Sequence, residues 1–339
     1  MSSLKPTLDP ESIYLVSGTI HPKLAEQTAK ALGIRLGPVN RKRFANSELY
    51  VQYANSVRGK HVIIIQTMAR NYDLDLSVND AIIETMLLID AARRSSAREI
   101  TVIVPYLGYS RQDRKAKGRE PISAAVITRM FEMAGAHRLV TIDVHSPQIQ
   151  GTFYGPFDHL VAGGLILEGL KAEMGKQDPE LFAIVSPDTG RAKASERAAD
   201  ELGIRLRHLQ KKRDRSDSSN VLRPRRLQGV DGRICFMLDD MIDTAGTLIT
   251  AAQTLRDSGA VGVVASATHA LLSDPAIERL QAGVIDKLIV TDTVPVDYAR
   301  QLLGNRLEVI SVAALLATAI QEIATGGSIS EMFDGNNYF

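Results

Sequence analysis

Short apolar runs alternate with longer amphipathic segments along most of the chain. The runs are mostly continuous rather than alternating, which is typical of strands that are covered on both faces. The predicted strands are residues 13–16, 62–66, 100–104, 139–143, 182–185, 234–238, 261–265 and 287–290. The predicted helices are residues 24–32, 80–92, 124–134, 191–202, 246–258, 276–282 and 312–323. This order of strands and helices predicts α/β domains with parallel sheets.

A change of pattern near the middle of the chain indicates two domains. Residues 148–160 are rich in Gly, Phe, Pro and Tyr and have no helical period, so we place the junction there. The predicted organisation is an N-terminal α/β domain at 11–160, a C-terminal α/β domain at 161–312, and a C-terminal helix and tail at 313–339. Ligands bind such sheets beyond the carboxyl ends of the strands, so we expect the chemistry to follow the predicted strands.

Composition excludes several classes of protein. The 339 residues are 45% hydrophobic, and 40 Lys and Arg nearly balance 39 Asp and Glu, for a net charge of +1. This balance argues against a generally basic nucleic-acid coat and against an acidic disordered chain. The single cysteine, Cys235, excludes an internal disulfide and a Cys-based zinc site, and its apolar run predicts a buried thiol. We predict a cytoplasmic protein without a membrane partner, because no apolar stretch could span a bilayer and the N-terminus has no apolar signal segment.

The strongest candidate for chemistry begins directly after the predicted strand at 234–238. Two carboxylates come first, and a short Asp-Thr-Ala-Gly-Thr loop then opens the predicted helix at 246–258. Backbone N–H groups, hydroxyls and the positive end of a helix dipole suit a phosphate monoester. The adjacent Asp239 and Asp240 can accept hydrogen bonds from two vicinal hydroxyls of a pentose. The structural alternative is an ordinary turn in which the aspartates cap the helix.

This run resembles the motif that binds phosphoribosyl diphosphate (PRPP) in type I phosphoribosyltransferases and in PRPP synthetases. Over about residues 12–335, several motifs in the same order make the chain similar to ribose-phosphate pyrophosphokinases, with the phosphate-activated class I as the most similar subgroup. The resemblance implies two phosphoribosyltransferase-like domains, each a mainly parallel sheet flanked by helices. The residues that it assigns to ribose 5-phosphate are Asp239, Asp240, Asp243, Thr244, Ala245, Gly246 and Thr247.

Three further segments resemble the ATP site of this family. The residues that the resemblance assigns to ATP are Phe44, Asn46, Glu48, Arg111, Gln112, Asp113 and His145. Alone, the first segment predicts a surface turn, and the second, a basic run, predicts a solvated loop. Ala116 stands where the family commonly has an acidic residue. A lone histidine after a strand is more often structural, but this one lies two residues after Asp143 in a run that matches the family's Mg²⁺–ATP segment.

The segment after the predicted strand at 182–185 resembles the pyrophosphate loop of the family. The matching residues are Ser186, Pro187, Asp188, Thr189 and Gly190. The resemblance implies Mg²⁺ as a cofactor, contacted by His145 and Asp188, and ATP as the co-substrate. Arg191 replaces a glycine that usually permits close backbone approach to phosphates, and Ala194 replaces a basic residue.

Residues 207–226 are the most basic segment of the chain and predict a mobile loop. A solvated charged loop is the structural alternative. A nucleic-acid contact is less favoured, because no aromatic residues interleave to stack bases. The family has its catalytic loop at this position, and the match implies Lys211 and Arg213 as the catalytic pair, which would neutralise developing phosphate charge.

The resemblance implies a reaction and its regulation. The reaction is transfer of diphosphate from ATP to the 1-hydroxyl of ribose 5-phosphate, which gives PRPP and AMP for nucleotide biosynthesis. A homo-oligomer, expected to be a hexamer, would bind phosphate and ADP as effectors. The residues that match the effector site are Ser56, Arg58, Arg119, Ser328 and Ser330.

Three alternatives to this reaction stand beside it. A type I phosphoribosyltransferase shares only the PRPP motif, and a non-catalytic paralogue of the synthetase would bind without turnover. A nucleic-acid-binding regulator is the third, but no helix-turn-helix pattern precedes the α/β pattern, and we predict no nucleic-acid partner.

Overall fold

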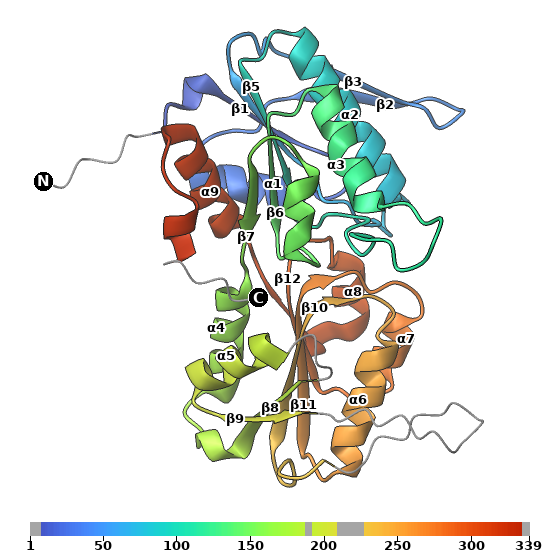
Figure 1. Ribbon diagram of the computed structural model, residues 1–339, viewed down its shortest axis with the longest axis vertical. Coiled ribbons are helices and arrows are strands. Elements are labelled where there is room, and N and C mark those ends of the chain that lie inside the picture. The colour runs from blue at the N-terminus through green and yellow to red at the C-terminus, as the bar shows by residue number, and fades with distance from the viewer. Residues whose placement is uncertain (1–7, 187–191, 209–226, 334–339) are drawn as a thin grey trace, which may run out of the picture. The chain divides into compact units, whose positions relative to one another are not determined.

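The computed structural model describes residues 8–186, 192–208 and 227–333 (Figure 1). The chain divides into two compact units. Unit 1 takes the described parts of residues 1–161, 293–295 and 311–337, and unit 2 takes those of residues 162–292 and 296–310. The polypeptide therefore passes from one unit to the other more than once.

Unit 1 is built on a parallel sheet of five strands in the order β1-β4-β5-β6-β7. The strands are β1 (Ile13–Ser17), β4 (His61–Ile65), β5 (Glu99–Val104), β6 (Arg138–Ile142) and β7 (Phe157–Leu160). The helices are α1 (Pro22–Leu32), α2 (Val78–Arg94), α3 (Ser123–Ala134) and α9 (Ala313–Thr325). Helices α2 and α3 cover one face of the sheet, and α1 packs beside α9 on the other (Figure 1). Two-sided burial explains why the central strands of this sheet are rich in apolar residues.

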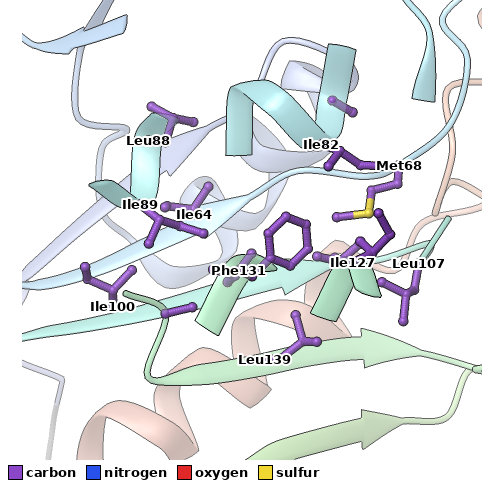
Figure 2. Close-up of a cluster of buried hydrophobic side chains, with 14 of the residues drawn as sticks. Ile64, Met68, Ile82, Leu88, Ile89, Ile100, Leu107, Ile127, Phe131 and Leu139 are labelled. Carbon is purple, nitrogen blue, oxygen red and sulfur yellow. The ribbon is translucent and has the colours of Figure 1, made fainter. Parts of the chain in front are cut away.

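The core of unit 1 lies between its sheet and helices α2 and α3. Figure 2 shows Phe131 of α3 among side chains from the strands and from α2, including Ile64, Ile89, Ile100 and Leu139. All five side chains are fully buried. Burial of apolar surface is worth roughly 25 cal/mol per Å², so this layer holds the strand ends, and the loops that follow them, on a rigid base.

A two-stranded antiparallel hairpin is added to this unit. It consists of β2 (Val39–Arg43) and β3 (Leu49–Tyr53), with Val39 opposite Tyr53. The Tyr53 hydroxyl donates to the Leu88 carbonyl at 3.0 Å and ties β3 to α2. The apolar pattern did not predict these strands, because β2 is largely polar and exposed along its length.

Unit 2 is built on a parallel sheet of six strands in the order β13-β12-β11-β10-β8-β9. The strands are β8 (Phe182–Ser186), β9 (Arg205–His208), β10 (Ile234–Ile242), β11 (Gly262–Ala270), β12 (Lys287–Thr291) and β13 (Leu307–Ile310). The helices are α4 (Gly163–Met174), α5 (Ala192–Leu202), α6 (Gly246–Asp257), α7 (Ala276–Gln281) and α8 (Asp297–Leu303). Short 3-10 helices occur in both units: Pro10–Ser12, Pro147–Thr152 and Ser330–Phe333 in unit 1, and Pro179–Leu181 and Gly304–Arg306 in unit 2.

Close helix packing marks this second sheet. At Gly169 of α4, an added Cβ would lie 2.7 Å from Ile310 Cδ1, so a larger residue here would require the Ile310 side chain or the helix to shift.

Cys235 of β10 is fully buried, as predicted, and burial raises the pKa of its thiol to about 12. No helix among the described residues is long and apolar enough to cross a membrane.

The structure corrects one boundary that bears on function. The sequence pattern ends the strand at residue 238 and places Asp239 and Asp240 after it, but β10 continues to Ile242. Both carboxylates therefore lie within the strand, and Asp239 is paired with Ala267 of β11. Both sheets are parallel throughout, as the pattern predicted.

Candidate functional site

Two loops at the carboxyl edge of the unit 1 sheet carry most of the proposed ATP residues. One follows β5 and contains Arg111 and Asp113, and the other follows β6 and contains His145 and Ser146. The Ser146 hydroxyl donates a hydrogen bond to the Asp113 carboxylate, so the two loops are directly joined. Arg111 and His145 are exposed. The structure thus brings the second and third of the three proposed ATP segments together.

Gln112 is held against the start of α3. The Ser123 hydroxyl donates to its side-chain oxygen, and the Gln112 carbonyl accepts from the Ala124 N–H at 3.2 Å. The Gln112 N–H donates to the Tyr109 carbonyl at 3.0 Å, in a turn where Tyr109 has a φ of 64°. This residue therefore shapes the loop in addition to its proposed contact with ATP.

The Glu120 carboxylate lies beside Ala116, the position where an acidic residue was expected from the resemblance. The N–H groups of Ala116 and Lys117 both donate to Glu120 Oε2, each at 2.8 Å. Glu120 therefore fixes the backbone at position 116 with a carboxylate that comes from four residues further on.

The first proposed ATP segment is the tip of the β2–β3 hairpin. Phe44, Asn46 and Glu48 are all exposed there, and the hairpin projects from the rest of unit 1 (Figure 1). The Glu48 N–H donates to Asn46 Oδ1 at 3.3 Å, and Ser47 has a φ of 72°, which closes a tight turn. The Phe44 ring is 41% exposed and carries the Lys42 ammonium 4.8 Å from its centroid. The surface turn that the residues alone predict is confirmed, and an aromatic ring remains open to a ligand.

The first turn of α2 connects the hairpin with the loop after β5. Ser77 and Asp80 form a reciprocal capping box, and Asp80 also accepts from Arg43 of β2. Partial burial would raise the pKa of Asp80, but the hydrogen bonds from Ser77 and the Arg43 guanidinium hold it below its usual value. Asn79 accepts from the Tyr109 hydroxyl at 2.6 Å. One helix start therefore contacts two of the proposed ATP segments.

Glu84 is a buried carboxylate that the sequence reasoning missed. It accepts from the Thr19 N–H and hydroxyl at 2.9 and 2.6 Å, from Gln66 Nε2 at 2.6 Å and from Arg41 Nε at 2.7 Å. It also lines a cavity of about 470 Å³ between the hairpin and α2. The available signal was a charge on the apolar face of the predicted helix at 80–92, one turn from Ala81 and Leu88.

Unit 2 carries the proposed ribose 5-phosphate residues at the end of β10 and the start of α6. Asp240 is buried and Asp239 is half-buried, and the Asp240 N–H donates to Asp239 Oδ1 at 2.8 Å. Ala245 has a left-handed φ of 58° at the N-terminus of α6. This bend makes the chain leave the strand and enter the helix within a few residues.

The loop between β10 and α6 is supported from α7. Arg279 Nη1 donates to the Thr244 carbonyl at 2.7 Å and would lie 3.0 Å from a Cβ added at Gly246. Thr244 and Thr247 are exposed, and Asp243 is half-buried beside them. The motif therefore runs from the last part of β10, through the connecting loop, into the first turn of α6.

Two other strands of unit 2 end at the same edge as β10, because the sheet is parallel. Ser186 is buried at the end of β8, and His208 ends β9 beside it in register. The proposed residues Pro187, Asp188, Thr189, Gly190, Lys211 and Arg213, and the substituted Arg191, lie outside the described residues.

The remaining proposed residues are those for a metal ion and for effectors. Within the described ranges, no group of three or more His, Cys, Asp or Glu side chains is arranged to hold a metal ion. The Arg58 N–H donates to the Ser56 hydroxyl at 3.4 Å in the segment before β4. Arg119 lies in the loop after β5, with a φ of 69°, and Ser328 and Ser330 follow α9. All of these proposed effector residues belong to unit 1.

Comparison with known proteins identifies both halves of the chain. Residues 13–135 match the family described as the N-terminal domain of ribose phosphate pyrophosphokinase, and residues 188–334 match the phosphoribosyl synthetase-associated domain. The ribose-phosphate pyrophosphokinase of Streptomyces coelicolor is 40% identical over 98% of this chain and 99% of its own length. That of Bifidobacterium longum is 42% identical over 96% of this chain and 93% of its own length.

A solved structure agrees with these relatives. The crystal structure of phosphoribosylpyrophosphate synthetase from Mycobacterium smegmatis has a TM-score of 0.83 and 38% identity, and the match covers 93% of this chain and all of that chain. The fold is therefore the two-domain α/β architecture of enzymes that handle phosphoribosyl groups, and the predicted fold class is confirmed. The match extends far beyond the PRPP motif, which is all that a type I phosphoribosyltransferase would share. The chain belongs to the ribose-phosphate pyrophosphokinase family.

Proposed function

We propose that this chain transfers the diphosphate of ATP to the 1-hydroxyl of ribose 5-phosphate and releases PRPP and AMP, a step of nucleotide biosynthesis. The observation that carries the proposal is the end of β10, where two carboxylates and a phosphate-type loop lead into α6. A pentose phosphate has vicinal hydroxyls that can bind to the two carboxylates and a phosphate monoester that can bind to the loop. Family membership over both halves supports the same reaction.

The acceptor sugar would be held by β10 and the loop that follows it. Asp239 and Asp240 accept from the ribose hydroxyls, and residues 243–247 enclose the 5-phosphate at the positive end of α6. Because Asp240 is buried and both residues lie in a central strand, their carboxylates are pre-positioned before the sugar binds.

ATP would be bound by unit 1. The exposed Phe44 ring stacks on adenine, with Asn46 and Glu48 at the edge of the base. Arg111 contacts the phosphates, with Gln112 and Asp113 beside it, and His145 contacts the phosphates or their cation. The hydrogen bond between Ser146 and Asp113 supports this grouping because it keeps Arg111 and His145 on adjoining loops.

The proposed cofactor is Mg²⁺. This ion prefers oxygen ligands, keeps several waters and is usually shared with substrate phosphates rather than enclosed by protein. Among the described residues, His145 is exposed at the edge of the sheet and is accessible to such an ion or to a water bound to it. Asp188 would hold the ion, and His145 would contact it, a water bound to it or the phosphates; the ion's chemical contribution would be to neutralise phosphate charge.

Lys211 and Arg213 are the proposed catalytic pair. Attack at the β-phosphorus develops negative charge on a crowded phosphate chain, and two cations placed there lower that barrier. A guanidinium can bind two phosphate oxygens at once, whereas an ammonium acts as a point charge, so the two residues are not interchangeable.

The proposal extends to assembly and control. A homo-oligomer, taken to be a hexamer, would act in the cytoplasm and bind phosphate as an activator and ADP as an inhibitor. The proposed effector residues are Ser56, Arg58, Arg119, Ser328 and Ser330, all of which belong to unit 1. Two guanidiniums and three hydroxyls suit an anion.

A direct assay tests the function. Purified protein is mixed with ATP, Mg²⁺, phosphate and ribose 5-phosphate, and the formation of AMP and PRPP is followed. Folded protein without turnover would refute the proposal in favour of a non-catalytic paralogue. The Lys211→Ala variant should then lose kcat by about 10²–10³-fold while ATP affinity stays within about twofold. An unchanged kcat would remove Lys211 from the catalytic pair.

A further inference from the structure

The backbone on the N-terminal side of His145 is held by β7, the edge strand of the unit 1 sheet. Asp143 is buried and has a left-handed φ of 39°, so the chain turns sharply as it leaves β6. The Asp143 N–H still donates to the Leu160 carbonyl of β7, at 3.0 Å. The next N–H, that of Val144, donates to Nε2 of His159 at 3.2 Å. The His159 side chain therefore accepts the next backbone N–H after the last backbone hydrogen bond to β7.

His159 can play this part only as a neutral ring with its proton on Nδ1. A hydrogen bond from a backbone N–H requires a free lone pair on Nε2. Burial lowers the pKa of His159 to about 4, which keeps the imidazole neutral at physiological pH. Register places His159 opposite Thr141, two residues before the turn, so the side chain reaches forward along the sheet.

The residue on the other side of His145 is also tied to another loop, through its side chain. The Ser146 hydroxyl donates to Asp113 in the loop after β5. His145 itself is exposed. Both neighbours of an exposed residue are thus fixed by side chains from other elements, which limits where the His145 imidazole can go.

We propose that His159 is a positioning residue for nucleotide binding, because its ring nitrogen accepts the Val144 N–H and so presents His145 to the phosphates of a nucleoside triphosphate. The role of His145 in this inference rests on the proposed function. His159 acts through the Val144 backbone and does not contact the ligand itself. Loss of the acceptor would let the turn at Asp143 relax and would weaken binding of the nucleotide, but not of the sugar phosphate.

Two substitutions separate the acceptor from the bulk of the ring. His159→Leu removes the acceptor but keeps an apolar side chain, and His159→Gln keeps an acceptor oxygen the same number of bonds from Cβ as Nε2. The chain offers a matched control at the amino edge of the same sheet, where His137 Nδ1 accepts the Ile100 N–H at 3.0 Å. His137→Leu removes the same kind of bond far from the proposed ATP loops.

The experiment measures nucleotide affinity and steady-state kinetics on the full-length protein. Titration calorimetry with a non-hydrolysable ATP analogue and Mg²⁺ should show affinity about fivefold to tenfold weaker in His159→Leu, and close to wild type in His159→Gln and His137→Leu. The KM for ATP should rise by the same factor in His159→Leu, with the KM for ribose 5-phosphate unchanged.

Three results would overturn the inference. His159→Leu could bind like wild type, His159→Gln could be as weak as His159→Leu, or His137→Leu could lose as much affinity as His159→Leu. Failure of the proposed function is recognised separately, because wild-type protein would then form no PRPP while the calorimetric comparison of the variants can still be made.

Discussion

Removal of the Glu84 carboxylate should loosen the hairpin that carries Phe44. Glu84→Leu deletes the acceptor of hydrogen bonds from Thr19, Gln66 and Arg41 and replaces it with a side chain that can make none. The Glu84 side chain is only 6% exposed, so water cannot easily take its place. The Arg41 guanidinium, which also donates to the Ser17 carbonyl, would keep its charge without its partner.

The expected loss in free energy of unfolding depends on how deeply Glu84 and Arg41 are buried. Breaking a fully buried pair costs about 3–5 kcal/mol, because the remaining charge is left in a poorly solvated place. The Arg41 side chain is 30% exposed and can turn towards water, so we expect a loss of about 3 kcal/mol, at the low end of that range. Glu84→Gln keeps the shape and one acceptor oxygen, and should lose about 2 kcal/mol.

Hydrogen exchange measured by mass spectrometry is the sharpest assay, because it reports the hairpin and the sheet separately. A loss of about 3 kcal/mol corresponds to roughly a hundredfold faster exchange of the β2–β3 amides. The amides of unit 2 provide an internal reference. Asp90→Asn is the matched control, since Asp90 lies on the same helix in an exposed ion pair with Arg94 and should change nothing measurable.

The outcome that would refute this reasoning is equally specific. If the hairpin amides of Glu84→Leu exchange as slowly as those of the Asp90→Asn control, the carboxylate does not anchor the hairpin. If all amides of unit 1 accelerate together, Glu84 stabilises unit 1 as a whole and has no particular role at the hairpin. Only selective acceleration of β2 and β3 supports the anchoring role.

Three further predictions concern other parts of the chain. Between pH 6.5 and about 4, His159 is protonated in the unfolded chain but not in the folded one, so the free energy of unfolding should decrease by up to about 3 kcal/mol as the pH is lowered through this range. Chemical denaturation should show a smaller decrease in His159→Gln, and an equal pH dependence in the variant and the wild type would contradict this. Gly169→Val would press into Ile310 and lower stability by about 1–3 kcal/mol in urea titration, whereas an unchanged midpoint would show that α4 can move away. Cys235 should react with a thiol reagent only after unfolding, and rapid modification of native protein would show that β10 opens locally.

Buried central strands were predictable from the chain, and polar or marginal ones were not. Residues 62–66 and 100–104 are mostly apolar, because helices cover them on both faces in the folded unit. Strand β2 and edge strand β9 are rich in Arg or Lys, so they show no apolar run and were missed. Their strand conformation comes from backbone pairing with β3 and β8, which a pattern of side chains does not record.

Some residues of the proposed site could also be predicted from the sequence, and others could not. The motif at residues 239–247 could be found because its polar residues are contiguous in sequence. The end of β10 was predicted too early, because β11 continues to pair with the part of the strand that contains the two carboxylates. Glu84 and His159 were not found, because their partners lie on other elements of the fold. His159 had no signal at all within the irregular segment at 148–160.

Unit 1 has a consequence for the order in which the protein can be made. Helix α9 comes from the far end of the sequence, yet it packs against α1, and Ser311 contacts Gln27. A nascent chain that has left the ribosome only as far as residue 161 has all five strands of this sheet but lacks the helix that covers α1. The N-terminal half must therefore wait for nearly the whole chain before it is complete, and a truncation before α9 would damage the unit that is synthesised first.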